Sequence, residues 1–88
     1  MGMTDTIERT LRERLAIERI EITDDSRRHA GHAGAASGGG HYIVTIVSSD
    51  FAGKSTLERH RMVYDALGAL MQREIHALVL TTRAPGEA

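Results

Sequence analysis

The spacing of apolar residues changes along the chain and divides it into predicted helices and strands. Ile7, Leu11 and Leu15 recur every four residues, which predicts a short amphipathic helix with one buried face. Thr4 or Asp5 is expected to cap the start of this helix, because short polar side chains satisfy the first free backbone N–H groups.

Three later segments have the patterns of strands. Residues 19–24 alternate, with Ile20 and Ile22 separated by polar side chains, and predict a strand buried on one face. The run HYIVTIVS over 41–48 is nearly continuous in apolar, mostly β-branched side chains and predicts a central strand. A third strand, ALVLTT, is predicted over 77–82.

A long amphipathic helix is predicted between the second and third strands. Ser55 and Glu58 have the spacing of a capping box, and apolar residues continue at helical spacing to about Glu74. Gly68 lies inside this pattern, where glycine costs roughly 1 kcal/mol relative to alanine, so we expect a close approach of a neighbouring element there. The resulting order of helix, strand, strand, helix, strand predicts a three-stranded mixed sheet backed by helices.

The segment between the first two strands is rich in glycine and histidine. Residues 26–40 contain five of the nine glycines, two histidines and no large apolar side chain, which predicts a flexible surface loop. We expect a single domain over 4–85 that includes this loop, with disordered ends at 1–3 and 86–88.

Composition narrows the classes of function. A chain of 88 residues with 41% apolar side chains fits one small domain and rules out a two-domain enzyme. The absence of cysteine excludes a disulfide framework, an all-thiolate cluster site and a thiol nucleophile. No nucleophile-elbow, phosphate-loop or zinc-protease motif occurs, so enzyme activity is not expected. The chain has no long apolar run or signal-like start, which favours a cytoplasmic protein without membrane contact.

The side chains best suited to metal binding are the five histidines, namely His29, His32, His41, His60 and His76. His76 lies between a helix and a buried strand, a rigid position that suits a metal ligand or, alternatively, a charge at the helix C-terminus. His29 and His32 are three residues apart and could chelate a metal, but alone they would form a weak, unselective site. Any single histidine is more often structural than a ligand.

A local basic cluster surrounds the start of the long helix. Lys54, Arg59, His60 and Arg61 could receive a phosphate there, since a helix N-terminus attracts anions. The alternative is an ordinary exposed helical turn. The net charge of −1 gives no general attraction to nucleic acid, and the few aromatic side chains argue against base stacking.

Several motifs together resemble the BolA family. They are VSSDFAGKSTLERHRMVYDAL, then IHALVLTT after a helical spacer, and the loop sequence DDSRRHAGHAGA. The resemblance covers essentially Ile7 to Pro85, and F-x-G, RHR and HAL in this order are specific. It implies an α+β fold similar to a class II KH domain, in the order α-β-β-α-α-β, with a short helix at about residues 56–60 before the main one.

The resemblance also implies a function. Family members pair with monothiol glutaredoxins of the CGFS type, and the pair shares a glutathione-ligated [2Fe–2S] cluster in iron–sulfur trafficking or iron and redox sensing. His76 matches the histidine of the HAL motif and His29 matches the loop histidine, with His32 as an alternative; this is the type with a histidine loop. Two imidazoles on one iron resemble Rieske ligation, which raises the reduction potential. The isolated chain is expected to bind no cofactor.

The family also includes bacterial DNA-binding transcription regulators, which gives the alternative function. The residues implied are Lys54, Arg59, His60 and Arg61. KH folds clamp the nucleic-acid backbone with a G-x-x-G loop, and FAGKS offers only Gly53. DNA and a weak homodimer are therefore partners to test beside the glutaredoxin.

Overall fold

The computed structural model describes residues 2–25 and 40–87, so most of the expected 26–40 loop, with His29 and His32, lies outside the described residues. Within them the elements follow the order expected from the resemblance. They are α1 (Met3–Arg14), β1 (Ile17–Asp24), β2 (Gly40–Ser48), the 3-10 helix η2 (Ser49–Phe51), α3 (Thr56–Leu67), α4 (Ala69–Arg73) and β3 (Ile75–Arg83).

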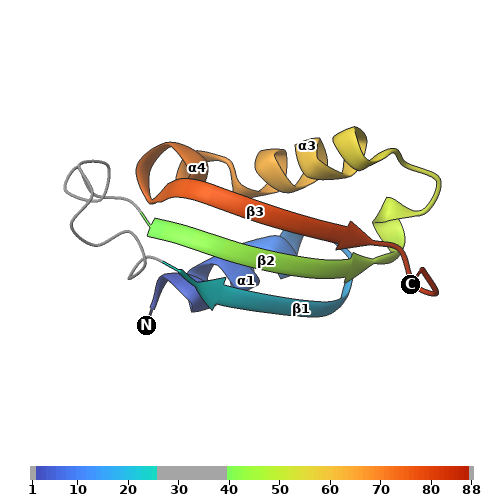
Figure 1. Cartoon of the computed structure of the whole chain (residues 1–88), viewed down its shortest axis with the longest axis horizontal. Helices are drawn as coiled ribbons and strands as arrows, with labels where there is room; N and C mark the ends of the chain where they lie inside the picture. The colour runs from blue at the N-terminus through green and yellow to red at the C-terminus, as the bar shows by residue number, and fades with distance from the viewer. Residues whose placement is uncertain (1, 26–39, 88) are drawn as a thin grey trace.

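The three strands form one mixed sheet in the order β1-β2-β3, and this confirms the prediction. β1 pairs with β2 in antiparallel orientation, whereas β3 pairs with β2 in parallel orientation. The parallel pairing follows from the crossover through α3 and α4, which returns the chain to the end of the sheet where β2 begins (Figure 1).

The core lies on one face of the sheet. Along β2 every second side chain is buried, namely Tyr42, Val44 and Ile46. Buried residues from the helices and from η2 belong to the same cluster: Ile7, Leu11, Phe51, Val63, Ala66 and Leu67. Figure 1 shows α1 passing behind the sheet and α3 running along β3. Both helices therefore cover the same face.

The long helix is interrupted at a different place from either expectation. The prediction of one continuous helix to Glu74 is wrong, and so is a separate helix at 56–60, because those residues begin α3. The break falls at Gly68, whose φ of 54° and ψ of −123° end α3 and precede α4. A positive φ favours glycine, which explains Gly68 better than the close approach expected there. The capping box of Ser55 and Glu58 is confirmed.

The two ends of the described chain also differ from expectation. Gly2, and neither Thr4 nor Asp5, is the N-cap of α1, so the helix begins at Met3 inside the segment expected to be disordered. At the other end Glu87 lies in a turn in which its backbone N–H donates to the carbonyl of Ala84 at 3.1 Å. Among the residues described, no helix has the length and apolar character needed to cross a bilayer.

Candidate functional site

Two histidines meet at the end of the sheet where β2 and β3 both begin. His41 is the second residue of β2 and His76 the second residue of β3. Their ring centroids lie 5.1 Å apart with an angle of 49° between the ring planes. Because the two strands are parallel, their first residues lie side by side although 35 positions separate them in sequence. The structure therefore forms a pair of imidazoles, which we call the histidine pair.

A bulge in β3 gives His76 its exposed position. Gly40 pairs with Ile75 and His41 pairs with Ala77, so β3 carries one more residue than β2 over this interval. His76 is that additional residue, and a β-bulge of this kind redirects a side chain. Ile75 is buried in the core while His76 is exposed. The bulge thus anchors the strand in the core and leaves the imidazole of His76 accessible.

Backbone hydrogen bonds hold the strands at the histidine pair. The N–H of Gly40 donates to the carbonyl of Glu74 at 2.9 Å, and the N–H of Asp25 donates to the carbonyl of His41 at 2.7 Å. Gly40 also leaves room for the ring of Tyr42, since a Cβ at this position would overlap that ring. The backbone positions of both histidines are therefore determined by residues immediately next to them.

The electrostatic environment at this end of the sheet is acidic. Burial raises the pKa of the Tyr42 hydroxyl, and the negative charges of Asp24 and Glu74 raise it further. The phenol therefore stays protonated at neutral pH, and the nearby carboxylates favour a positively charged ligand over an anion.

The histidine pair offers two of the nitrogen ligands that transition metals prefer. Within residues 2–25 and 40–87 no group of three or more histidine, cysteine, aspartate or glutamate side chains could hold a metal. Within the described residues the histidine pair alone therefore does not make up a metal site. A metal held there would take its other ligands from residues outside those ranges or from other molecules.

His41 is the site residue that sequence reasoning missed. It was one of five histidines, and nothing in its local pattern distinguished it. A usable signal existed, because His41 begins one predicted strand and His76 immediately precedes another, and parallel strands joined by a crossover start at the same end. His76 remains a predicted ligand that the structure places in a suitable position.

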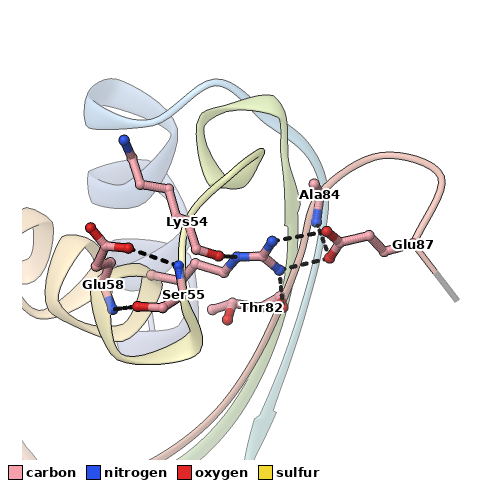
Figure 2. A network of polar contacts seen from close by, with 7 residues as sticks. Lys54, Ser55, Glu58, Thr82, Ala84 and Glu87 are labelled. Atoms are coloured by element: carbon pink, nitrogen blue, oxygen red, sulfur yellow. Dashed lines mark hydrogen bonds and ion pairs between the residues drawn. The ribbon is translucent and has the colours of Figure 1, made fainter.

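The basic cluster lies at the opposite end of the sheet, and its members differ in their surroundings. Arg59 has a side chain only 12% exposed, and its two Nη atoms donate to the carboxylate of Glu87 at 2.6 and 2.8 Å. It also donates to the carbonyls of Thr82 and Lys54, at 3.2 and 3.0 Å. Figure 2 shows this network, which joins the start of α3 to the turn after β3.

The network changes what the basic cluster can bind. Glu87 neutralises Arg59, and this guanidinium lowers the pKa of the Glu87 carboxyl to about 2, with a further contribution from the Ala84 N–H. In this structure the guanidinium of Arg59 is thus engaged by Glu87, and a phosphate contact by Arg59 stays a prediction. Lys54 and Arg61 are exposed and His60 is half-buried, so they remain accessible cluster members.

Comparison with known proteins identifies the family. The family model described as BolA-like protein matches residues 11–87. The chain belongs to the BolA-like family. It is 38% identical over 82 residues to the DNA-binding transcriptional regulator BolA of Escherichia coli, covering 93% of this chain and 75% of that protein. It is also 43% identical over 89 residues to an uncharacterized protein in the cobS 5' region of Sinorhizobium sp., covering 99% of this chain and 96% of that protein.

Solved structures agree with this assignment. The BolA domain of SufE1 from Arabidopsis thaliana superimposes with a TM-score of 0.84 at 34% identity, covering 100% of this BolA-like chain and 99% of that chain. In sequence the chain is 37% identical to SufE-like protein 1 of the same plant, and it spans only 23% of that longer protein. The BolA-like fold thus also occurs as a domain of a larger protein.

Proposed function

We propose that this BolA-like chain is a non-enzymatic partner of a monothiol glutaredoxin of the CGFS type. In this proposal the two proteins share a glutathione-ligated [2Fe–2S] cluster for iron–sulfur trafficking or for iron and redox sensing. The observation that carries the proposal is the histidine pair, whose ring centroids are 5.1 Å apart. His76 of this pair is exposed, whereas the Nε2 atom of His41 is buried.

The ligand types fit such a cluster. One iron of a Rieske-type cluster takes two imidazoles in place of two thiolates, and the chain has no cysteine of its own. The glutaredoxin cysteine and the glutathione thiol would supply the sulfur ligands. When bound, the cluster provides a one-electron redox group and a unit of iron and sulfide that can be passed on.

His76 is the first proposed ligand, since it is exposed and held by a bulge next to the buried Ile75. The second imidazole has three candidates. The structure favours His41 because it lies next to His76, whereas the family resemblance favours His29, with His32 as its alternative. The choice among these three is part of the test.

The test is an anaerobic titration of this protein into cluster-loaded CGFS glutaredoxin, followed by visible circular dichroism. We expect a new spectrum that is lost with His76→Ala and with one of His41→Ala, His29→Ala or His32→Ala, because a lost ligand changes the coordination of one iron. His60→Ala is the matched control, since His60 lies on α3 away from the pair. An unchanged spectrum on adding the wild-type chain would contradict the proposal.

A second candidate function is DNA binding, which is favoured by the similarity to the Escherichia coli regulator. Here the exposed side chains of Lys54 and Arg61 would contact phosphates. Fluorescence anisotropy with a DNA duplex should then show affinity that falls steeply as salt rises from about 50 to about 200 mM. Lys54→Gln and Arg61→Gln should each weaken binding, and an absence of binding at low salt would eliminate this candidate.

A further inference from the structure

The face of the sheet opposite the helices carries exposed apolar side chains. Ile43 of β2 and Val79 of β3 are paired neighbours, with 38% and 60% of their surface exposed. The described helices pack on the other face (Figure 1), because the buried residues of β2 alternate with these positions. Among the described elements none covers this side, which we call the open face.

The open face is continuous with the histidine pair. His41 precedes Ile43 by two residues, so their Cα atoms are about 7 Å apart along the strand and their side chains leave the same side of the sheet. Ala77, the partner of His41, precedes Val79 in the same way. One ligand that reached the histidine pair and extended along the strands would therefore cover the apolar pair.

Polar residues border the apolar pair on the side away from the histidines. Thr45 and Thr81 form the next pair along β2 and β3, and Arg83 follows opposite Val47. On β1 the side chain of Arg19 donates to Glu21 at 3.1 Å. An apolar centre with a polar and charged rim is the arrangement found in protein–protein interfaces.

The size of the open face limits what can bind there. Three strands spaced about 4.8 Å apart and about nine residues long present on the order of 400 Å², and a standard interface buries about 800 Å² per partner. The face alone would thus support only a weak complex, such as a transient homodimer. A partner that also shares a metal with the histidine pair gains a second attachment, which the face does not provide.

We propose that the open face is the docking surface for the protein that supplies the thiolate ligands of the shared metal site. Ile43 and Val79 form its apolar centre, and the histidine pair marks the edge where the metal is held. This inference rests on the proposed function and adds to it the surface through which the partner is recognised before any metal is transferred.

The test compares Val79→Asp with Leu57→Asp in calorimetric titrations with a cluster-free CGFS glutaredoxin. Leu57 is a matched control because it is an apolar residue 61% exposed on α3, away from the open face. We expect Val79→Asp to weaken binding about tenfold or more, since a charge would be buried at the centre of the interface. Leu57→Asp should bind the cluster-free partner as the wild type does.

Folding is checked by thermal unfolding of each variant. If Val79→Asp does not fold, Val79→Thr takes its place, since threonine has the same shape and a high strand propensity. Removing one apolar group from the interface should then weaken binding about fourfold. Wild-type affinity in the folded Val79 variant would overturn the inference.

The outcomes separate the docking surface from the shared cluster. If the Val79 variant binds normally while His76→Ala loses the cluster spectrum, the inference fails and the proposed function stands. If the wild-type chain binds only cluster-loaded glutaredoxin, the inference fails and the proposed function stands. If it binds neither the cluster-free nor the cluster-loaded form, both fail. If sedimentation velocity shows a wild-type homodimer that Val79→Asp dissociates while glutaredoxin binding is unchanged, the occupant of the face is a second copy and the inference is overturned.

Discussion

The two ends of the sheet are built in different ways. At the end where β2 and β3 finish, polar side chains are engaged in hydrogen bonds within the protein. Arg59 binds Glu87, Ser48 accepts from the N–H of Asp50 at 3.1 Å, and Asp50 accepts from the N–H of Ala16 at 2.9 Å. At the end where the strands begin, backbone hydrogen bonds determine the geometry and His76 is exposed.

The difference separates structural polar residues from residues available for binding. RHR and HAL each contain a histidine, and the sequence alone offers both as candidate binding sites, RHR for nucleic acid and HAL for a metal. The two ends lie about 25 Å apart along a nine-residue strand, so the motifs cannot serve one site. At the end where β2 and β3 finish, Arg59 connects the start of α3 to the turn after β3. At the end where the strands begin, His76 is exposed and accessible to a ligand.

The largest expected effect is a loss of folding stability at the end of the sheet where β2 and β3 begin. Gly40→Ala would drive a Cβ into the ring of Tyr42, and overpacking of this kind costs about 1–3 kcal/mol in the free energy of unfolding. Urea unfolding measures the loss. In a Tyr42→Leu background the same substitution should cost clearly less, because the overlapping ring atoms are gone. An equal cost in both backgrounds would show that the Tyr42 ring is not the cause.

The next largest effect is on the melting temperature and concerns the end of the sheet where β2 and β3 finish. Arg59→Gln should lower the melting temperature on the order of 5 °C, because it removes the hydrogen bonds to Glu87 and to the carbonyl of Thr82. Arg61→Gln, two residues along the same exposed helix, is the matched control and should change the melting temperature little. Similar losses for both arginines would remove the distinction between them.

A pH dependence should follow from the same network. The pKa of Glu87 falls from its ordinary value of 4.5 to about 2 in the folded protein. Its stabilising contribution is thus complete above about pH 5 and is lost as the pH falls from about 4.5 towards 2. An NMR titration of the Glu87 carboxyl should give a midpoint near 2 in the wild type. In Arg59→Gln the midpoint should move back towards 4.5, and an unmoved midpoint would contradict the role of Arg59.

The smallest expected effect is on the free energy of unfolding when His76 is replaced, and it tests whether the two ends of the sheet differ. His76→Ala should change the free energy of unfolding of the isolated chain by less than about 0.5 kcal/mol, because the side chain is exposed. Urea unfolding of His76→Ala and Arg59→Gln side by side compares the loss in free energy of unfolding at the two ends of the sheet. A large loss of stability for His76→Ala would show that this histidine is structural, and would weaken its assignment as a ligand.

Local patterns in the sequence predicted most of the elements. The alternation at Ile20 and Ile22, the β-branched run of β2 and the capping box at Ser55 each arise from neighbours within a few residues, so they could be identified without tertiary information. The position of His76 between a helix and a strand was visible for the same reason. The break at Gly68 was not, because a glycine inside a helical pattern is compatible both with a tolerated residue and with a helix end.

The sequence by itself determined the three strands, their mixed sheet and the position of His76 between a helix and a strand. Only the tertiary structure decided that His41 lies beside His76, that Glu87 occupies Arg59, and that Ile43 and Val79 share the open face. Each of these depends on contacts between residues 28 to 36 positions apart. Strand register, bulges and the choice of covered face determine such contacts, and a local pattern of hydrophobic and polar residues does not specify them.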